Sequence, residues 1–528
     1  EIEGKAPVNP LCCAMVYQRS VAMRWLVVLP VAVFLLAWWG YVQALPYAQP
    51  PYDDSCIAQQ YARHLFSTGM FTFDGETPSR GATSPPHVIL LALARSVISD
   101  PVIAARLIGL VCHGGFLVLL FLLIRDLGCR SSVAVVVVSA AASCGFLVVD
   151  SLNGLETSLF HFLSTALILI ALRARDTKGL LLLAVVAWLV CWCRPEGFLL
   201  VAVFLPFFLW RLKSRPLPAR IHPLIIAALF LGPFLVGMGY FLREGTPSWQ
   251  VKMIFYGEAG LPLGEKTRLA WHGVGAFAYF LRWYLVIPFA ALCLRFASRW
   301  TPRLSCQSPG CFVAGTGSPT WLSRSVLSFV LVFYSVYLWC LPSALFYLDF
   351  RYQHVLLPWV FVAVAWGFEG LVSRMRSITM RRVAFSLLTL TLLLGSIMTY
   401  RGCRTVYMDC VRSVGNVLIP LAERLGRMAM PGDVVAAHDV GVLGYFSGLR
   451  VVDLVGLTDP RVSAMLKRGD YVARDHILGA GHGFLVAHPV WDELYLGIDP
   501  DEPGSGFRFL FETELAFGDR YRVYRFGE

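Results

Sequence analysis

Apolar residues follow one another in long runs over about the first 400 residues of the chain. A helix needs about 20 apolar residues to cross a bilayer core, and about 11 runs approach that length. The chain is 57% hydrophobic and only 15% charged, which is typical of a protein whose solvent is the membrane. The pattern predicts a mainly α fold, a polytopic membrane helix bundle of about 11 transmembrane helices. We place these helices at roughly 25–45, 103–124, 133–149, 157–172, 179–193, 198–212, 221–241, 272–296, 326–347, 354–372 and 383–400.

Shorter apolar stretches with alternating helical and extended periodicity follow from residue 401. We expect a helix over 411–427, a strand at 433–438 and a short helix that begins at Val440. Further strands are expected at 450–455, 483–487, 508–513 and 521–526. The predicted division is therefore a cytoplasmic N-terminal leader at 1–24, a transmembrane domain at 25–400, and a soluble α/β domain at 401–528.

The segment 46–102, between the first two predicted spans, is much longer than a turn requires. Residues Tyr52–Ser55 indicate a helix start, because Asp and Ser side chains satisfy the free amides of a first turn. We expect this helix to end near Phe66 and a second, apolar helix to cover His87–Ile98. Unstructured loops of this length are usually functional, so the segment is predicted to be a catalytic outer loop.

Basic residues are distributed unevenly among the loops between the predicted spans. Alternate loops collect arginine and lysine, for example those at 173–178 and 374–382. Short cytoplasmic loops carry this excess, so the N-terminus is predicted to be cytoplasmic and the loop 46–102 and the C-terminal domain extracytoplasmic. The same loops account for the net charge of +11, which therefore does not indicate a nucleic-acid partner.

The other ionisable residues gather on the predicted outer face. A carboxylate that accepts a proton from an acceptor hydroxyl, together with cations that bind a departing phosphate, is the chemistry of glycosyl transfer. Arginine suits phosphate because its guanidinium pairs with two oxygens at once. The candidates for proton transfer are Asp53 and Asp54. The candidates for donor-phosphate or substrate binding are Arg351, Arg194, Glu196, Glu156, Lys252 and Tyr352.

Each of these candidates also has a purely structural interpretation. The two aspartates or Glu156 could only cap a helix, since carboxylates are favoured at helix starts. Arg194 could form an interfacial ion pair with Glu196, and Arg351 could pair with Asp349. These alternatives predict the same residues at the same boundary but no ligand.

Spacing does not identify which of Asp53 and Asp54 is the base, and we favour Asp53 slightly. As a pair they are the candidate ligands for a divalent cation, Mg²⁺ or Mn²⁺, and no cofactor is certain. The fourteen cysteines form no metal signature. Cys403 and Cys410 share the outer compartment, where they either form a disulfide or remain thiols.

Short motifs occur along most of the chain in an order that is found in one group of membrane enzymes. They lie at Asp53–Leu65, Phe73–Glu76, Gly81–Pro85, Gly154–Thr157, Arg194–Gly197, Asp349–Tyr352, His438–Gly448 and Val452–Pro460. With these motifs the chain resembles bacterial GT-C glycosyltransferases, especially those grouped around the mycobacterial terminal arabinofuranosyltransferase of cell-wall arabinan. The resemblance implies a catalytic aspartate in the first outer loop and a sugar donor carried on polyprenyl phosphate.

The resemblance also implies a place and a product. A bacterial inner-membrane enzyme of this group, surrounded by membrane lipid, would transfer a sugar to a glycan or glycolipid acceptor of the cell envelope. The tail motif adds His438 and Asp439 to the substrate-binding candidates. The family often has Arg where Gln60 stands, and Pro-Asn-Thr where Thr246–Ser248 precedes Lys252. These departures leave the sugar open, with arabinofuranose as one candidate.

Two other classes of protein would also have many apolar helices. A secondary transporter is expected to carry inverted repeats and broken helices with polar groups near the bilayer midplane, whereas here the ionisable groups are predicted at the outer boundary. A non-catalytic membrane assembly partner of cell-envelope synthesis would use its tail to bind another protein. Turnover of a lipid-linked sugar discriminates all three.

Overall fold

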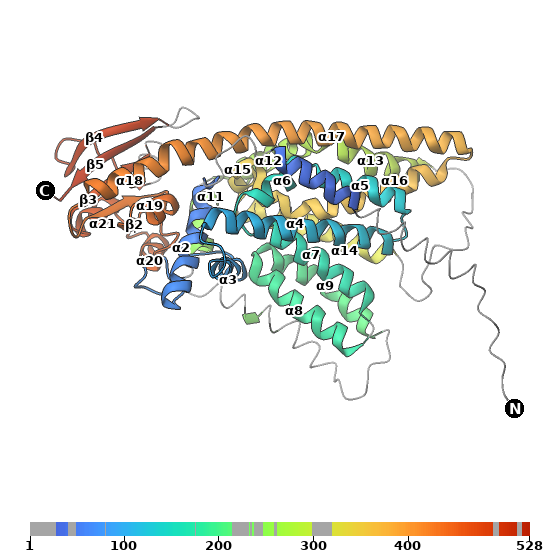
Figure 1. Cartoon of the computed structure of the whole chain (residues 1–528), viewed down its shortest axis with the longest axis horizontal. Helices are drawn as coiled ribbons and strands as arrows, with labels where there is room; N and C mark the ends of the chain where they lie inside the picture. Colours follow the sequence, from blue (N-terminus) through green and yellow to red (C-terminus); the bar gives the residue numbers. More distant parts are fainter. Residues whose placement is uncertain are drawn as a thin grey trace.

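The computed structural model describes residues 28–40, 49–79, 81–174, 176–213, 232, 235–236, 247–257, 261–297, 319–488, 496–514 and 520–527. Within these residues the chain forms a bundle of helices with a smaller domain at one end of it (Figure 1). The predicted span 221–241 and the predicted leader lie almost entirely outside the described residues.

The bundle is built from helices of very different lengths. Its first half comprises the helix Val28–Gly40, α2 (Asp53–Thr68), α3 (Pro85–Ala94), α4 (Pro101–Asp126), α5 (Ser131–Ala142), α6 (Gly145–Leu152), α7 (Thr157–Arg173), α8 (Thr177–Cys193) and α9 (Glu196–Lys213). Its second half comprises α11 (Pro247–Tyr256), α12 (Leu263–Phe280), α13 (Arg282–Ala297), α14 (Pro319–Cys340), η1 (Pro342–Phe346), α15 (Tyr347–Phe350), η2 (Arg351–Leu356), α16 (Leu357–Arg374) and α17 (Ile378–Ser413). A continuous apolar core that includes Phe116, Phe146 and Trp359 holds these helices together.

The smaller domain is an α/β domain with a five-stranded sheet in the order β2-β1-β3-β5-β4. Its elements are α18 (Ile419–Met428), β1 (Val434–Ala437), α19 (Val440–Phe446), β2 (Arg450–Asp453), α20 (Pro460–Arg468), α21 (Ala473–Gly479), β3 (Gly483–Ala487), β4 (Phe507–Glu514) and β5 (Arg520–Phe526). β1 pairs in parallel with β2 and β3, while β5 runs antiparallel to β3 and β4. All five predicted strands are present, and the short helix begins at the predicted Val440.

Fewer helices than expected are long enough to cross a membrane. Among the described residues four helices qualify by length and apolar composition, or up to six if each of two bent helix pairs is one span. Other predicted spans correspond to shorter helices such as Thr157–Arg173 and Thr177–Cys193. At about 1.5 Å per residue such helices are shorter than the bilayer core, so the predicted number of about 11 spans is not confirmed.

The last helix of the bundle continues into the smaller domain (Figure 1). α17, a π-helical turn at Val414–Leu418 and α18 form one rod of 51 residues, Ile378–Met428. A rod of that length measures about 75 Å, more than twice the thickness of a bilayer core, so part of it projects beyond the membrane. The boundary expected at residue 401 therefore falls inside a helix, because no proline precedes Pro420 in this stretch.

The two cysteines that could have formed an outer disulfide lie on this same rod. Cys403 and Cys410 are seven positions apart on α17, which separates them by about 10 Å along the helix axis. Bridged cysteines need Cα atoms within about 7 Å of each other. Both residues are free thiols.

The smaller domain packs directly on the outer loop. Arg63 of α2 donates a hydrogen bond to the backbone carbonyl of Tyr445 at 3.1 Å, and its guanidinium lies 4.8 Å from the centre of the Tyr445 ring. Arg95 donates to the Tyr445 hydroxyl at 3.1 Å. The contact is close enough that a Cβ on Gly441 would lie 2.1 Å from the Asp53 carbonyl oxygen. The outer loop and the C-terminal domain are therefore on the same side of the membrane.

Which side that is can be measured by cysteine labelling. Glu76 of the outer loop and Glu502 of the smaller domain are both exposed. With Glu76→Cys or Glu502→Cys in a background that lacks the native cysteines, we expect a membrane-impermeant maleimide to label both positions in intact cells. Labelling of both positions only after permeabilisation would place this face in the cytoplasm and reverse the predicted orientation.

Candidate functional site

The two aspartates of the outer loop point in different directions. Asp53 and Asp54 open α2, which begins with no side-chain cap at its N-terminus. The carboxylate of Asp53 accepts hydrogen bonds from the amides of Gly441 at 2.9 Å and Val442 at 2.6 Å, so it binds the start of α19 rather than its own helix. Asp54 accepts a hydrogen bond from the guanidinium of Arg351 at 2.7 Å. Asp54 lines a cavity of the bundle, and Asp53 is not among the residues that line this cavity.

The position of Asp53 suits a structural contact between the helix bundle and the C-terminal domain better than the role of a base. Burial and the neighbouring Asp439 carboxylate raise the pKa of Asp53, while the hydrogen bonds from the two amides lower it. Both carboxylate oxygens nevertheless face backbone amides. This geometry reverses the slight preference for Asp53, because the Asp54 carboxylate is the one that faces the cavity.

Arg351 is held by an unusual stretch of backbone. Asp349 and Phe350, immediately before it, both have left-handed conformations, with φ angles of 56° and 64°. Such conformations cost about 1–3 kcal/mol each in residues other than glycine and persist where the surroundings enforce them. Here His354 enforces the turn: its Nε2 donates to the Asp349 carbonyl at 2.9 Å, and its Nδ1 lies 3.0 Å from the Asp150 carboxylate. Asp349 therefore supports the turn and does not pair with Arg351.

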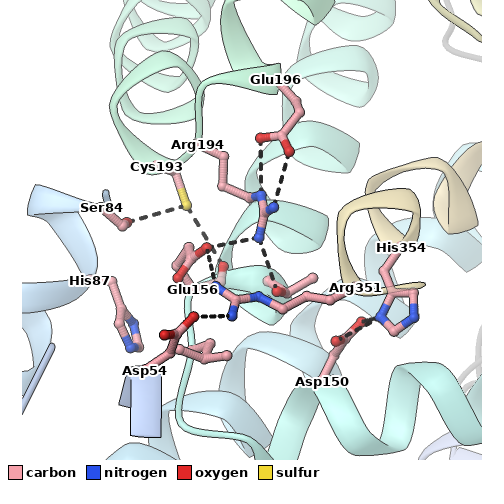
Figure 2. Close-up of polar contacts among 12 residues, drawn as sticks. Asp54, Ser84, His87, Asp150, Glu156, Cys193, Arg194, Glu196, Arg351 and His354 are labelled. Atoms are coloured by element: carbon pink, nitrogen blue, oxygen red, sulfur yellow. Dashed lines mark hydrogen bonds and ion pairs between the residues drawn. The ribbon is translucent and has the colours of Figure 1, made fainter. Parts of the chain in front are cut away.

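Arg194 occupies the centre of an ion-pair network (Figure 2). Its Nε and Nη2 donate to both oxygens of Glu196 at 3.1 and 3.0 Å, and its Nη1 donates to Glu156 at 2.7 Å. The Tyr337 hydroxyl donates to Glu196 at 2.6 Å. Arg194 and Glu196 are only 2% and 3% exposed. These contacts occupy Arg194, so it is better suited to hold the two carboxylates than to bind a donor phosphate.

Glu156 links this network to Arg351. Its carboxylate lies 2.7 Å from Arg194 and 3.8 Å from the Arg351 Nη2 (Figure 2). Burial alone would raise the pKa of Glu156, but the two guanidinium groups hold it at about 2. Glu156 is therefore a fixed negative charge at neutral pH and a poor proton acceptor.

Three cations surround the ring of Tyr352. Lys252, Arg194 and Arg351 lie 5.7, 5.9 and 5.9 Å from its centre. Among the described residues, Lys252 has no ion-pair partner, and the buried Tyr352 hydroxyl and Arg351 Nε have no hydrogen-bond partner. Buried polar groups are rarely left unpaired, so these three groups are available to a ligand.

Two cavities meet at these residues. One contains Asp54 and His87, the other Arg194, Glu196, Tyr337 and Tyr352. Both are lined by Thr83, Glu156, Lys252 and Arg351. These shared residues connect the two cavities, which have volumes of about 50 and 30 Å³.

His438 and Asp439 lie apart from the site. Neither residue lines the two cavities. His438 lies 3.2 Å from the Asp439 carboxylate, which also accepts a hydrogen bond from the Tyr521 hydroxyl. Burial would raise the pKa of Asp439, but His438 and Tyr521 hold it at about 2. These residues support the start of α19, on which Asp53 is bound.

The two aspartates do not form the metal pair considered from sequence. Their carboxylates are bound to different partners, the amides of α19 and the guanidinium of Arg351. In the part of the chain that the structure describes, no three His, Cys, Asp or Glu residues are arranged to hold a metal ion. The geometry of Asp53 and Asp54 therefore does not fit a shared divalent cation.

His87, which belongs to none of the motifs in the sequence, lines the Asp54 cavity. This residue is 2% exposed, and its Nε2 donates to the Gly154 carbonyl at 3.0 Å. Its Nδ1 has no partner among the described residues and is a free acceptor. The signal for this residue in the sequence is its position two residues after the Gly81–Pro85 motif.

Comparison with known proteins finds a structural match to nearly the whole chain but a sequence match only to its C-terminal part. A family model described as a domain of unknown function (DUF8728) matches residues 411–523. A search of curated protein sequences gives no match. Over 96% of this chain, the structure is similar to ArnT from Cupriavidus metallidurans bound to undecaprenyl phosphate, with a TM-score of 0.55, 11% sequence identity and 98% of that protein covered. The apo form of the same protein gives a TM-score of 0.53 and 13% identity, with the same shares covered.

At these identities the likeness concerns the fold alone. The chain shares the overall fold of ArnT, a helix bundle followed by a C-terminal domain, and membership of the GT-C superfamily stays a prediction. The chain is a membrane protein by its fold and its apolar helices. The arabinofuranosyltransferase subgroup stays a prediction.

Proposed function

We propose that this protein is a membrane glycosyltransferase that takes its sugar from a polyprenyl-phosphate donor and transfers it to a hydroxyl of a cell-envelope acceptor. The observation that carries the proposal is the position of Arg351. It pairs with the Asp54 carboxylate, and it lines a cavity together with Lys252, which has no ion-pair partner in the part of the chain that the structure describes. The ArnT structure with the same fold contains undecaprenyl phosphate, a ligand of the class that we assign to this site.

The donor phosphate would bind between Lys252 and Arg351. Lys252 has no ion-pair partner among the described residues, and the Arg351 Nε is a buried donor without one. A phosphate at this position would compete with Asp54 for the guanidinium of Arg351. Binding of the donor would therefore release the Asp54 carboxylate from its ion pair at the moment when a base is required.

Transfer would then proceed by one displacement in which charges balance. The acceptor oxygen bonds to the anomeric carbon, the bond from that carbon to the phosphate oxygen breaks, and the leaving polyprenyl phosphate retains the electron pair. Asp54 accepts the hydroxyl proton, while Arg351 and Lys252 stabilise the negative charge that develops on phosphate. Glu156 and Arg194 act indirectly, since they fix the guanidinium of Arg351.

The identity of the transferred sugar and the side of the membrane on which the site lies are also part of the proposal. We retain arabinofuranose as the first donor to test because of the motif resemblance, with the site on the extracytoplasmic face of a bacterial inner membrane. The acceptor hydroxyl would enter the cavity that contains Asp54 and His87.

Binding of the lipid carrier tests the phosphate site without turnover. We expect Lys252→Met to weaken binding of undecaprenyl phosphate by about 10- to 100-fold, because a hydrogen bond between charged groups contributes about 1.5–3 kcal/mol. Lys467→Met is the matched control, since Lys467 is exposed and lines neither cavity. Native mass spectrometry of the purified chain titrated with the lipid gives both affinities. Equal affinities of the wild type and the Lys252 variant would remove Lys252 from the site.

A further inference from the structure

A separate cleft of about 510 Å³ lies between the outer loop and the C-terminal domain. The loop contributes Phe73, Asp74 and Thr77. The domain contributes β2, residues of the segment that follows it up to the start of α20, and Asp475, His476 and Gly479 of α21. Ligand sites often occur where two structural units meet, and a cleft of this size accommodates a small organic ligand or part of a chain.

The lining of this cleft favours a hydroxyl-rich and uncharged ligand. Four aspartates (Asp74, Asp453, Asp459 and Asp475) and two arginines (Arg450 and Arg461) line the cleft, which leaves a formal excess of two negative charges. Asp459 pairs with Arg461, and backbone amides bind the Asp74 and Asp453 carboxylates. This excess of negative charge disfavours a phosphorylated ligand. β2 is an edge strand of the sheet, so backbone amides and carbonyls on its free side are open to hydrogen bonding. Mixed donors and acceptors beside a few apolar side chains suit sugar hydroxyls.

A fixed segment separates this cleft from the Asp54 cavity. Leu457 lines the Asp54 cavity and the next residue, Thr458, lines the cleft. Asp453 holds this segment, because its carboxylate accepts hydrogen bonds from the Val455 and Thr458 amides at 3.1 and 2.5 Å and from the Thr458 hydroxyl at 2.8 Å. The separation is thin: a Cβ on Gly81 would lie 2.4 Å from the Leu457 carbonyl oxygen.

We infer that this cleft binds the acceptor as a neutral oligosaccharide chain, which lies beside the Asp54 cavity on the other side of the Leu457–Thr458 segment. The inference rests on the proposed glycosyltransferase function and names its acceptor class, a glycan and not a phosphorylated glycolipid headgroup. The residues that carry it are Arg450, Asp475 and His476, which lie on the cleft and outside the Asp54 site.

Binding of oligosaccharides in the absence of donor tests this inference. The probes are neutral linear hexasaccharides of arabinofuranose, mannose and glucose, and a phosphorylated glycolipid for comparison. Isothermal titration with the purified full chain should show binding of at least one neutral hexasaccharide. We expect Asp475→Ala and His476→Ala each to weaken it about 10-fold, the loss that corresponds to about one hydrogen bond. Asp470→Ala is the matched control, because Asp470 is exposed and does not line the cleft.

Three outcomes would overturn the inference. They are unchanged affinity in both cleft variants, binding of the phosphorylated glycolipid alone, and no binding of any neutral hexasaccharide. None of these results depends on catalysis. If the wild-type protein binds the oligosaccharide but turns over no donor, the proposed transferase function is contradicted and the cleft remains a glycan-binding site.

Discussion

Asp54→Asn should lower turnover of a polyprenyl-phosphate sugar by about two to four orders of magnitude, the contribution expected of a positioned general base. Asparagine has nearly the same volume and still accepts the hydrogen bond from Arg351, which measures 2.7 Å in the wild type. The variant should therefore remain folded and still bind the donor. Release of polyprenyl phosphate by the purified variant, followed by mass spectrometry, measures the effect.

Asp53→Asn is the control that separates the two aspartates. Asparagine at position 53 can accept from one of the two α19 amides but presents its own NH₂ group to the other. We expect weaker docking of the C-terminal domain and a smaller loss of turnover than at Asp54. A larger loss of turnover at Asp53 than at Asp54 would return the role of base to Asp53.

Arg194→Leu should have the largest effect on stability. Leucine is smaller than arginine and apolar. The buried carboxylate of Glu196 therefore loses both of its hydrogen bonds from the guanidinium. Glu156 loses its 2.7 Å contact as well. Removing one member of a buried ion pair costs about 3–5 kcal/mol, because the remaining charge stays buried. Thermal unfolding of the variant in the same detergent, followed by tryptophan fluorescence, should show a clearly lower midpoint.

Arg173→Leu provides a matched control for that experiment. Arg173 also pairs with one carboxylate through two hydrogen bonds, to Asp126 at 2.6 and 3.0 Å. Its side chain is 49% exposed, however, and exposed pairs contribute at most about 1 kcal/mol. Similar midpoints for the Arg194 and Arg173 variants would show that the buried network is not structural in the way we describe.

Local periodicity was sufficient to predict much of the fold. The strands of the C-terminal domain carry regular apolar patterns bounded by turn residues, and all were found close to the expected positions. The number of membrane spans could not be predicted in the same way. Apolar composition is shared by full spans and by short helices such as α5 and α6, which form a pair bent by 57°. The bend depends on tertiary packing, which a hydropathy pattern does not contain.

The candidate site was predicted as a set of residues but not as an arrangement. Charge and motif order single out Asp54, Glu156, Arg194 and Arg351, and the structure places these four side chains in one ion-pair network. Sequence could not show that Asp53 binds a helix almost 400 positions away, because that contact requires the C-terminal domain to be docked. His87 stands two positions after the Gly81–Pro85 motif, which was a signal for it, but its contact with Gly154 depends on packing between distant parts of the chain.

Turnover by the wild-type protein tests the central claim most directly. Purified protein in lipid nanodiscs would be incubated with undecaprenyl-phosphate-linked arabinofuranose, mannose or glucose and with an oligosaccharide mixture. Mass spectrometry would follow undecaprenyl phosphate and glycosylated products over time. We expect at least one donor to give equal amounts of free undecaprenyl phosphate and extended oligosaccharide, at a rate that Asp54→Asn reduces at least about 100-fold. No release above the protein-free rate from any donor, or equal release by Asp54→Asn, would contradict the account.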